Sequence, residues 1–221
     1  MPQPERVFLD WTGPTARAAA HWLVTRNPVA HGTDLSDTLV VVPTRQASRR
    51  LREELANASP AGVLSPRTIT PAQFLQPDDN DVAGSLESIA TFLDVFEKFP
   101  AQNLAALFPN GIPFRTFEER THFARTFFEL RASLTDANWT LRAAARQLGE
   151  HADSERWESL AGLEQAHFDA LRRIGRRDRE TARLELAASP AVSANVRNIV
   201  IVGLADLTPL AVRALSSLPA A

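Results

Sequence analysis

The 221-residue sequence predicts an α/β protein in which a large all-helical insertion interrupts a parallel β-sheet. Two runs of β-branched and apolar residues, at 38–42 and 196–202, are typical of strands buried on both faces of a parallel sheet. Between them, apolar residues recur at helical spacing. We therefore expect a discontinuous α/β domain of residues 1–80 and 190–221, truncated after one last strand and helix, around a helical subdomain of residues 81–189.

The composition excludes several kinds of metal and redox site and indicates where the protein is located. The chain has no cysteine, which excludes disulfides, zinc-thiolate sites and iron–sulfur clusters and fits a reducing cytoplasm. It has neither a membrane-length apolar segment nor a signal-peptide pattern, so we expect a cytoplasmic protein without membrane contact. The formal net charge is -2, so any nucleic-acid binding must come from a local basic surface.

The first part of the chain is predicted to alternate strands and helices. Strands are expected at 6–10, 38–42 and 67–70, and helices at 16–25, at 46–57 and, briefly, from Pro71. The polar stretch 27–37 is expected to be a link. This alternation is typical of a parallel sheet with helical crossovers.

The middle of the chain is predicted to be helical from about Asp81. Its last helix is expected to be long and to end near Ala188, with apolar residues sharing one face: Trp157, Leu160, Phe168 and Leu171. A buried strand at 196–202 follows, then a loop at 203–206 and a helix at 207–218. The last strand is expected to join the first sheet.

The strand, turn and helix at 7–23 stand where a nucleotide-binding α/β protein places its phosphate loop. That loop needs G-x-x-x-x-G-K-[ST], but this turn offers Gly13, a proline, Thr15 and Arg17, and the one lysine of the chain is Lys98. After the strand at 196–202, the first carboxylate is Asp206. The sequence therefore predicts a degenerate nucleotide site made of Gly13, Thr15, Arg17 and Asp206, with no catalytic residue and no cofactor.

The sequence also lacks the residues that a nuclease core and a histidine metal site require. A restriction-type nuclease core needs a lysine two residues after an acidic metal ligand, and Phe96 stands two residues before Lys98. The five histidines show no paired metal spacing, so no metal site is expected.

Two arginine clusters remain as candidate phosphate-binding surfaces. Arg45, Arg49, Arg50 and Arg52 follow a buried strand, and Arg172, Arg173, Arg176, Arg177 and Arg179 lie near the end of the long helix. Guanidinium groups suit phosphate, but acidic residues are interspersed in both clusters. Ordinary solvated helix faces are the alternative.

Four stretches, taken in order, resemble one family: residues 7–14, 39–52, 157–164 and 199–210. Together they are similar to the amino-terminal region of AddB-type subunits (AddAB/RexAB, RecBCD-like), which belong to the PD-(D/E)XK nuclease family proteins and partner the AddA helicase–nuclease in double-strand break repair. The resemblance implies a P-loop NTPase-like, superfamily 1 helicase-like domain with a helical insertion. It also implies a subunit that binds DNA without being the motor, with a nuclease domain far downstream.

The resemblance also implies site residues. Thr44 and Arg45 match the positions of the motif that meets single-stranded DNA, and Arg49 and Thr70 are further candidates. We therefore expect a non-catalytic part of an exonuclease complex that binds DNA, as a single strand or a duplex end, and an AddA-type subunit. Two alternatives remain: a protein–protein scaffold without DNA contact, and an atypical ATPase around Arg17.

Overall fold

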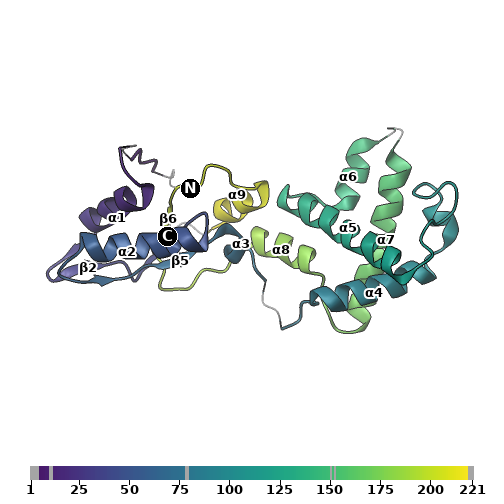
Figure 1. Cartoon of the computed structure of the whole chain (residues 1–221), viewed down its shortest axis with the longest axis horizontal. Coiled ribbons are helices and arrows are strands. Elements are labelled where there is room, and N and C mark those ends of the chain that lie inside the picture. Colours follow the sequence, from purple (N-terminus) through teal and green to yellow (C-terminus); the bar gives the residue numbers. More distant parts are fainter. Residues whose placement is uncertain (1–4, 10–11, 78–79, 150, 152, 219–221) are drawn as a thin grey trace. The chain divides into compact units, whose positions relative to one another are not determined.

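A computed structural model describes residues 5–9, 12–77, 80–149, 151 and 153–218 (Figure 1). Within these residues the chain forms two compact units. We call them the α/β unit, which holds the residues up to Gln76, Pro190–Leu207 and those from Ser216, and the helical unit, which holds Pro77–Ser189 and Thr208–Leu215.

The main sheet of the α/β unit is parallel. Its strands are β3 (Thr38–Val41), β5 (Arg67–Ile69) and β6 (Asn198–Ile201), in the order β5-β3-β6. β3 is the central strand, and all four of its residues are buried. The α/β class, the parallel pairing and the joining of the last strand to the first sheet are thereby confirmed.

Two helices cover one face of this sheet: α1 (Thr15–Arg26) and α2 (Arg45–Ala58). Alternate residues of a strand face the same side, so Val40 and Val42 both reach these helices. The buried core joins them to Leu23 of α1 and to Leu51 and Leu55 of α2. Both helices lie where the sequence predicts them, within two residues at each end.

The prediction of a first strand is wrong for residues 6–9. Residues 6–9 form no strand, and Asp10 and Trp11 lie outside the described residues. Phe8 is 93% exposed, and only Leu9 of this segment packs against the core. Both sides of central β3 are already occupied, by β5 and β6, so a short apolar run had no free place beside it.

The stretch 27–37, expected to be a plain link, contains two short strands of a second sheet. β1 (Pro28–Val29) runs antiparallel to β2 (Gly32–Asp34), and β2 runs parallel to β4 (Val63–Leu64). Gly32 has a φ of 104°, and a Cβ there would lie 2.4 Å from the carbonyl oxygen of Gly62. Only glycine therefore fits this close approach. Strands of two or three residues are too short to show a period in the sequence.

The helical unit is built from α4 (Ser85–Lys98), the short 3-10 helix η1 (Ala101–Leu104), α5 (Phe117–Asp136), α6 (Leu141–Leu148), α7 (Ser154–Arg173), α8 (Arg179–Ala188) and α9 (Pro209–Ser216). Its core is aromatic. Phe92 of α4 stacks on Phe127 of α5 with ring centroids 4.6 Å apart, and Leu141 and Leu163 complete the buried cluster. No helix among the described residues is long and apolar enough to cross a membrane.

The prediction of one long helix that ends near Ala188 is wrong, because two helices occupy this segment. α7 ends at Arg173, Gly175 adopts a φ of 70°, and α8 starts at Arg179. Asp178 caps α8 by accepting a hydrogen bond from the backbone N–H of Thr181 at 2.9 Å. The glycine and this cap redirect the chain. α9, which the sequence pattern grouped with the sheet, belongs to the helical unit.

Candidate nucleic-acid interface

Two threonines stand at the same edge of the main sheet. Thr44 follows β3 and Thr70 follows β5, and since these strands are parallel neighbours, their carboxyl ends lie side by side. Each threonine caps the helix that follows it. Thr44 caps α2, and Thr70 caps α3 (Pro71–Phe74). The structure thus brings these two sequence-predicted residues to one edge.

The two hydroxyl groups differ in whether their proton is still available to donate a hydrogen bond to a ligand. The Thr44 hydroxyl accepts from the Ala47 backbone N–H at 3.0 Å and keeps its own proton for another acceptor. The Thr70 hydroxyl accepts from the Gln73 backbone N–H and also donates to the Gln73 Oε1 at 3.2 Å. Of the two, Thr44 is better suited to donate to a ligand.

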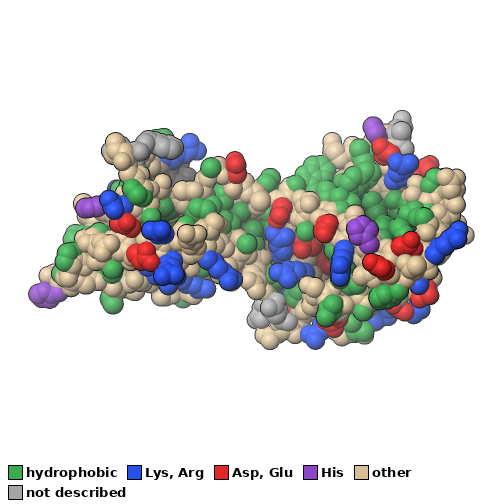
Figure 2. Space-filling view, viewed as in Figure 1, with side chains coloured by type: hydrophobic (Ala, Val, Ile, Leu, Met, Phe, Trp, Pro, Cys, Tyr) green, Lys and Arg blue, Asp and Glu red, His purple; other side chains and the backbone are tan. Residues whose placement is uncertain are grey.

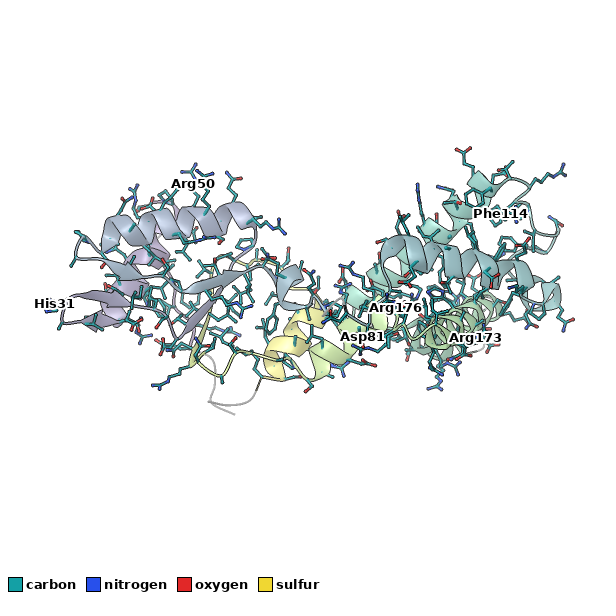
Figure 3. All side chains as sticks on the ribbon, turned by 90° about the horizontal axis from the view of Figure 1, so that it is seen from below. His31, Arg50, Asp81, Phe114, Arg173 and Arg176 are labelled. Atoms are coloured by element: carbon teal, nitrogen blue, oxygen red, sulfur yellow. The ribbon has the colours of Figure 1, made fainter. Side chains whose placement is uncertain are left out.

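The arginines of α2 also differ in their engagement. Arg45 and Arg50 are exposed, and neither makes an ion pair or hydrogen bond to another described side chain. Arg49 pairs with Glu53 at 3.1 Å, and Arg52 donates to the Ser48 hydroxyl at 3.0 Å. Figure 2 shows basic side chains gathered along α2 with acidic ones between them, and Figure 3 labels Arg50 on the outer side of this helix.

Ser48 fixes the orientation of α2. Its hydroxyl is hydrogen-bonded to the hydroxyl of Thr68 on β5, so the helix is held to the sheet by a half-buried polar contact as well as by its leucines. Arg45 and Thr44 therefore keep a defined position at the sheet edge. The contact joins residues 20 apart in the sequence, so no local pattern reveals it.

A small cavity of about 170 Å³ lies at the carboxyl ends of β3 and β6, beside the first turn of α1. Doubly wound sheets bind nucleotides at this position. The described residues that line the cavity are almost all apolar, with only the Thr15 hydroxyl as a polar side-chain group: Thr15, Ala16, Val42, Pro43, Ala47, Leu51, Val202 and Gly203. Ligand pockets usually start near 300 Å³.

The other residues of the predicted degenerate site do not converge on this cavity. Gly13 is exposed and has no neighbour within 4 Å of a Cβ position. Arg17 donates instead to Glu54 of α2 at 3.3 Å. Asp206 is exposed in the loop after β6. Thr15 alone of the four lines the hollow.

Three of the five arginines of the second cluster form ion pairs with described carboxylates. Arg176 pairs with Glu87 at 3.3 Å, Arg177 with Asp81 at 2.6 Å, and Arg172 with Asp169 at 3.3 Å. Figure 3 labels Arg176 and Asp81 in this part of the helical unit. Arg177 also forms a parallel β-bridge with Val82, so side-chain and backbone contacts together hold the segment around Asp81 to the connection between α7 and α8.

A buried charge cluster in the helical unit was not foreseen. Arg131 of α5 donates through Nε to Glu164 of α7 at 2.8 Å and through both terminal nitrogens to Asp178, at 2.8 and 2.7 Å. All three side chains are buried. His167 lies in the same interior with neither ring nitrogen hydrogen-bonded. The three charges lie 33 and 47 residues apart, a spacing that no local pattern reveals.

Burial and ion pairing compete in this cluster. Burial disfavours the charged form of every member, but the hydrogen bonds and charge of Arg131 outweigh it at Asp178 and lower the pKa of that carboxyl. At Glu164 burial prevails and raises the pKa. Burial lowers the pKa of His167 to about 4, which keeps its imidazole neutral at pH 7.

Within the described residues, no group of three or more histidine, aspartate or glutamate side chains is placed to hold a metal ion. A comparison with models of protein families finds no family that matches this chain. A comparison with curated protein sequences finds no significant match.

Proposed function

We propose that this chain is a non-catalytic, P-loop NTPase-like and helicase-like part of a DNA-processing subunit, and that it holds the DNA backbone at the start of α2. The observation that carries the proposal is the guanidinium group of Arg45, which has no ion-pair partner among the described residues and stands next to the available Thr44 hydroxyl at the carboxyl edge of a parallel sheet. Arg50, more than one turn further along α2, has no described partner either. Guanidinium groups and a hydroxyl donor are the groups that hold phosphate.

The surroundings of α2 favour an anion. Its first turn has no acidic residue, and the positive end of the helix dipole lies at Thr44 and Arg45. Such contacts read no base, so the binding we propose is independent of sequence. Arg49 is held partly by Glu53 and contributes less, while Thr70 acts as a cap rather than a ligand.

Two observations support a role without ATP hydrolysis. The hollow at the ends of β3 and β6 is lined by apolar groups and is small for a nucleotide. The one cation of the predicted degenerate site, Arg17, is paired with Glu54. An atypical ATPase around Arg17 would need that pair to open.

The wider assignment is supported by the sequence alone. The ordered resemblance of residues 7–14, 39–52, 157–164 and 199–210 to AddB-type subunits favours a place in a cytoplasmic helicase–nuclease complex for double-strand break repair. An AddA-type motor would then be the protein partner, with an exonuclease site downstream.

Fluorescence anisotropy with a tailed DNA duplex tests the DNA contact. We expect Arg45→Ala with Arg50→Ala to weaken binding by about 3- to 10-fold and to lower the slope of log affinity against log salt by about 1 to 2, since each arginine releases roughly one counterion. Arg146→Ala is the matched control, because Arg146 is exposed on α6 and pairs with no described residue.

Unchanged affinity and salt slope in the double variant would contradict the proposed contact, and no binding at all at low salt would favour the scaffold. Equilibrium binding of ATP with magnesium is the companion measurement. Micromolar affinity with turnover would reject the non-catalytic assignment.

A further inference from the structure

The helical unit contains an open groove of about 500 Å³ between η1 and α7. Small and apolar residues form much of its floor, and polar residues stand along its rim. The described lining is Phe99, Gln102, Asn103, Ala105, Ala106, Glu155, Glu158, Ser159 and Gly162. The volume lies within the range of sites that bind ligands. The proposed DNA contact uses none of these residues.

Glutamates are the only charged side chains in the described lining of the groove. Glu155 and Glu158 are exposed, and neither makes an ion pair or hydrogen bond to another described residue. The basic residue between them, Arg156, pairs with Asp153 at 3.2 Å and does not line the groove. The helix dipole favours the charge of Glu155 in the first turn of α7, but Glu158 lies beyond that turn. The unpaired charge at the groove is therefore negative.

The floor of the groove contains a glycine that the fold does not demand. Gly162 lies inside α7, where glycine costs about 0.5–1 kcal/mol relative to alanine. Its φ is not positive, and a Cβ there would lie 3.4 Å from the ring of Phe99, at the short end of ordinary packing contact. An alanine would thus fit the folded chain. What the missing side chain provides is open space in the groove.

The remaining lining groups suit a peptide. Phe99 and Ala106 offer half-buried apolar surface, on which the aliphatic stem of an arginine or lysine can lie. Gln102 and Asn103 are exposed, and their side-chain amides make no hydrogen bond to a described residue. An amide both donates and accepts, as a peptide backbone requires. A simple inorganic cation would use neither the apolar surface nor the amides.

We propose that this groove binds a short basic segment of a partner protein. The stem of one arginine or lysine lies on Phe99 and over Gly162. Its charged head meets the carboxylates of Glu155 and Glu158, and the amides of η1 hold the peptide backbone. Charge complementarity selects this occupant, because an acidic segment would be repelled by both carboxylates. The site is independent of the α2 surface, so it stands or falls apart from DNA binding.

An NMR titration of the isotope-labelled full chain tests the groove with a defined peptide. The probe is a hexapeptide with blocked ends in which leucine, arginine and alanine occur twice in that order. The same peptide with glutamine in place of arginine is the comparison without charge, and spermidine is the comparison without a peptide. We expect the arginine peptide to bind about tenfold more tightly than either and to shift the amide signals of Asn103 and Gly162.

Two glutamate variants locate the charge contact. Glu155→Gln with Glu158→Gln should weaken binding of the arginine peptide by about 3- to 10-fold, since each exposed ion pair contributes a modest amount. Glu118→Gln with Glu129→Gln on α5 is the matched control. Both control residues are exposed without a described partner, and the change in net charge is the same, so the affinity should stay as it is.

Gly162→Ala separates the groove from the fold. The added methyl group occupies the floor, so it should weaken binding by about 3-fold or more, by an amount of the order that one methyl group changes recognition in a tight site. The urea midpoint should stay the same or rise, because alanine favours the helix interior. A glycine required for packing would give a lower midpoint instead.

Absence of binding by the arginine peptide at millimolar concentration would overturn the proposal. So would equal affinity for the glutamine peptide or for spermidine, or an affinity that survives the change of both groove glutamates. DNA affinity measured on the same variants should not move, which separates this site from the one on α2.

Discussion

Arg131 shows how a single residue organises the helical unit. Its guanidinium joins α5 to α7 through Glu164 and to the start of α8 through Asp178. Three of its five N–H groups donate to carboxylates in this buried cluster. A buried pair of this kind adds little net free energy compared with apolar packing, but removing one partner leaves an uncompensated charge.

We therefore expect Arg131→Met to lower the free energy of unfolding by about 3–5 kcal/mol, since two buried carboxylates would lose their counter-charge. Urea denaturation followed by circular dichroism measures the change. Arg146→Met, on an exposed arginine, should change it by less than about 0.5 kcal/mol. A loss below about 1 kcal/mol for Arg131→Met would show that water reaches the cluster.

His167 makes stability depend on pH. The pKa of its imidazole is about 4 in the folded chain and about 6.5 when unfolded, so the unfolded state binds more protons between these values. Stability is then fully present above about pH 6.5 and is lost as pH falls toward 4. The maximum loss is about 3 kcal/mol.

His167→Phe should remove this part of the pH dependence, because a phenyl ring suits a pocket already formed with Phe92 and Phe128. Unfolding free energies at pH 7 and pH 5 measure it for both proteins. The raised pKa of Glu164 acts in the opposite direction and remains in the variant, so the difference between the proteins isolates the histidine. Equal pH slopes would reject this account.

At the scale of elements, the long periodic segments were predictable. α1, α2 and the strands β3, β5 and β6 match their sequence patterns because each combines an apolar run with a cap or a turn residue. The pattern could not reveal what depends on distant partners. Arg6–Leu9 reads as a strand but pairs with no described strand. The break at Gly175 is followed by the cap residue Asp178, whose buried carboxylate pairs with the distant Arg131.

The candidate interface was predictable to a similar degree. The resemblance implies Thr44 and Arg45 as site residues, and their position at the sheet edge could be predicted because they directly follow a buried parallel strand. Which arginines stay unpaired could not be foreseen, because Arg49 and Arg17 find their carboxylates through side-chain geometry. The groove between η1 and α7 is formed by two segments that are distant in the sequence and leaves no trace in either of them.

Capping offers a test at this scale. Thr116 and Glu119 form a capping box at the start of α5, with reciprocal hydrogen bonds. Thr116→Ala should lower the free energy of unfolding by about 1 kcal/mol. Thr126→Ala, within the same helix, should have an effect of no more than about 0.5 kcal/mol, since alanine favours the helix interior. A similar loss in both variants would point to packing rather than the cap.

At the scale of the whole molecule, the chain has two separate hydrophobic cores. One contains Leu51 and Leu55 beneath the main sheet, and the other contains Phe92 and Leu163 among the helices. Each core draws its residues from one unit. Separate cores of this kind are the basis for separate folding units.

We expect differential scanning calorimetry to resolve two unfolding transitions. Leu51→Ala should lower the midpoint of one and Leu163→Ala that of the other, since each creates a cavity that costs about 2–5 kcal/mol in its own core. A single transition that both variants shift equally would show that the cores unfold together.

Asp178 makes two contacts that couple the folding of α8 to that of α5. One carboxylate both starts α8, through Thr181, and receives Arg131 from 47 residues earlier in the chain. The cap itself is local, but the buried carboxylate gains its counter-charge only after the loop to Arg131 has closed, so α8 is not stable as a local element. The first amides of α8 should therefore gain protection from hydrogen exchange together with those of α5, and late in folding.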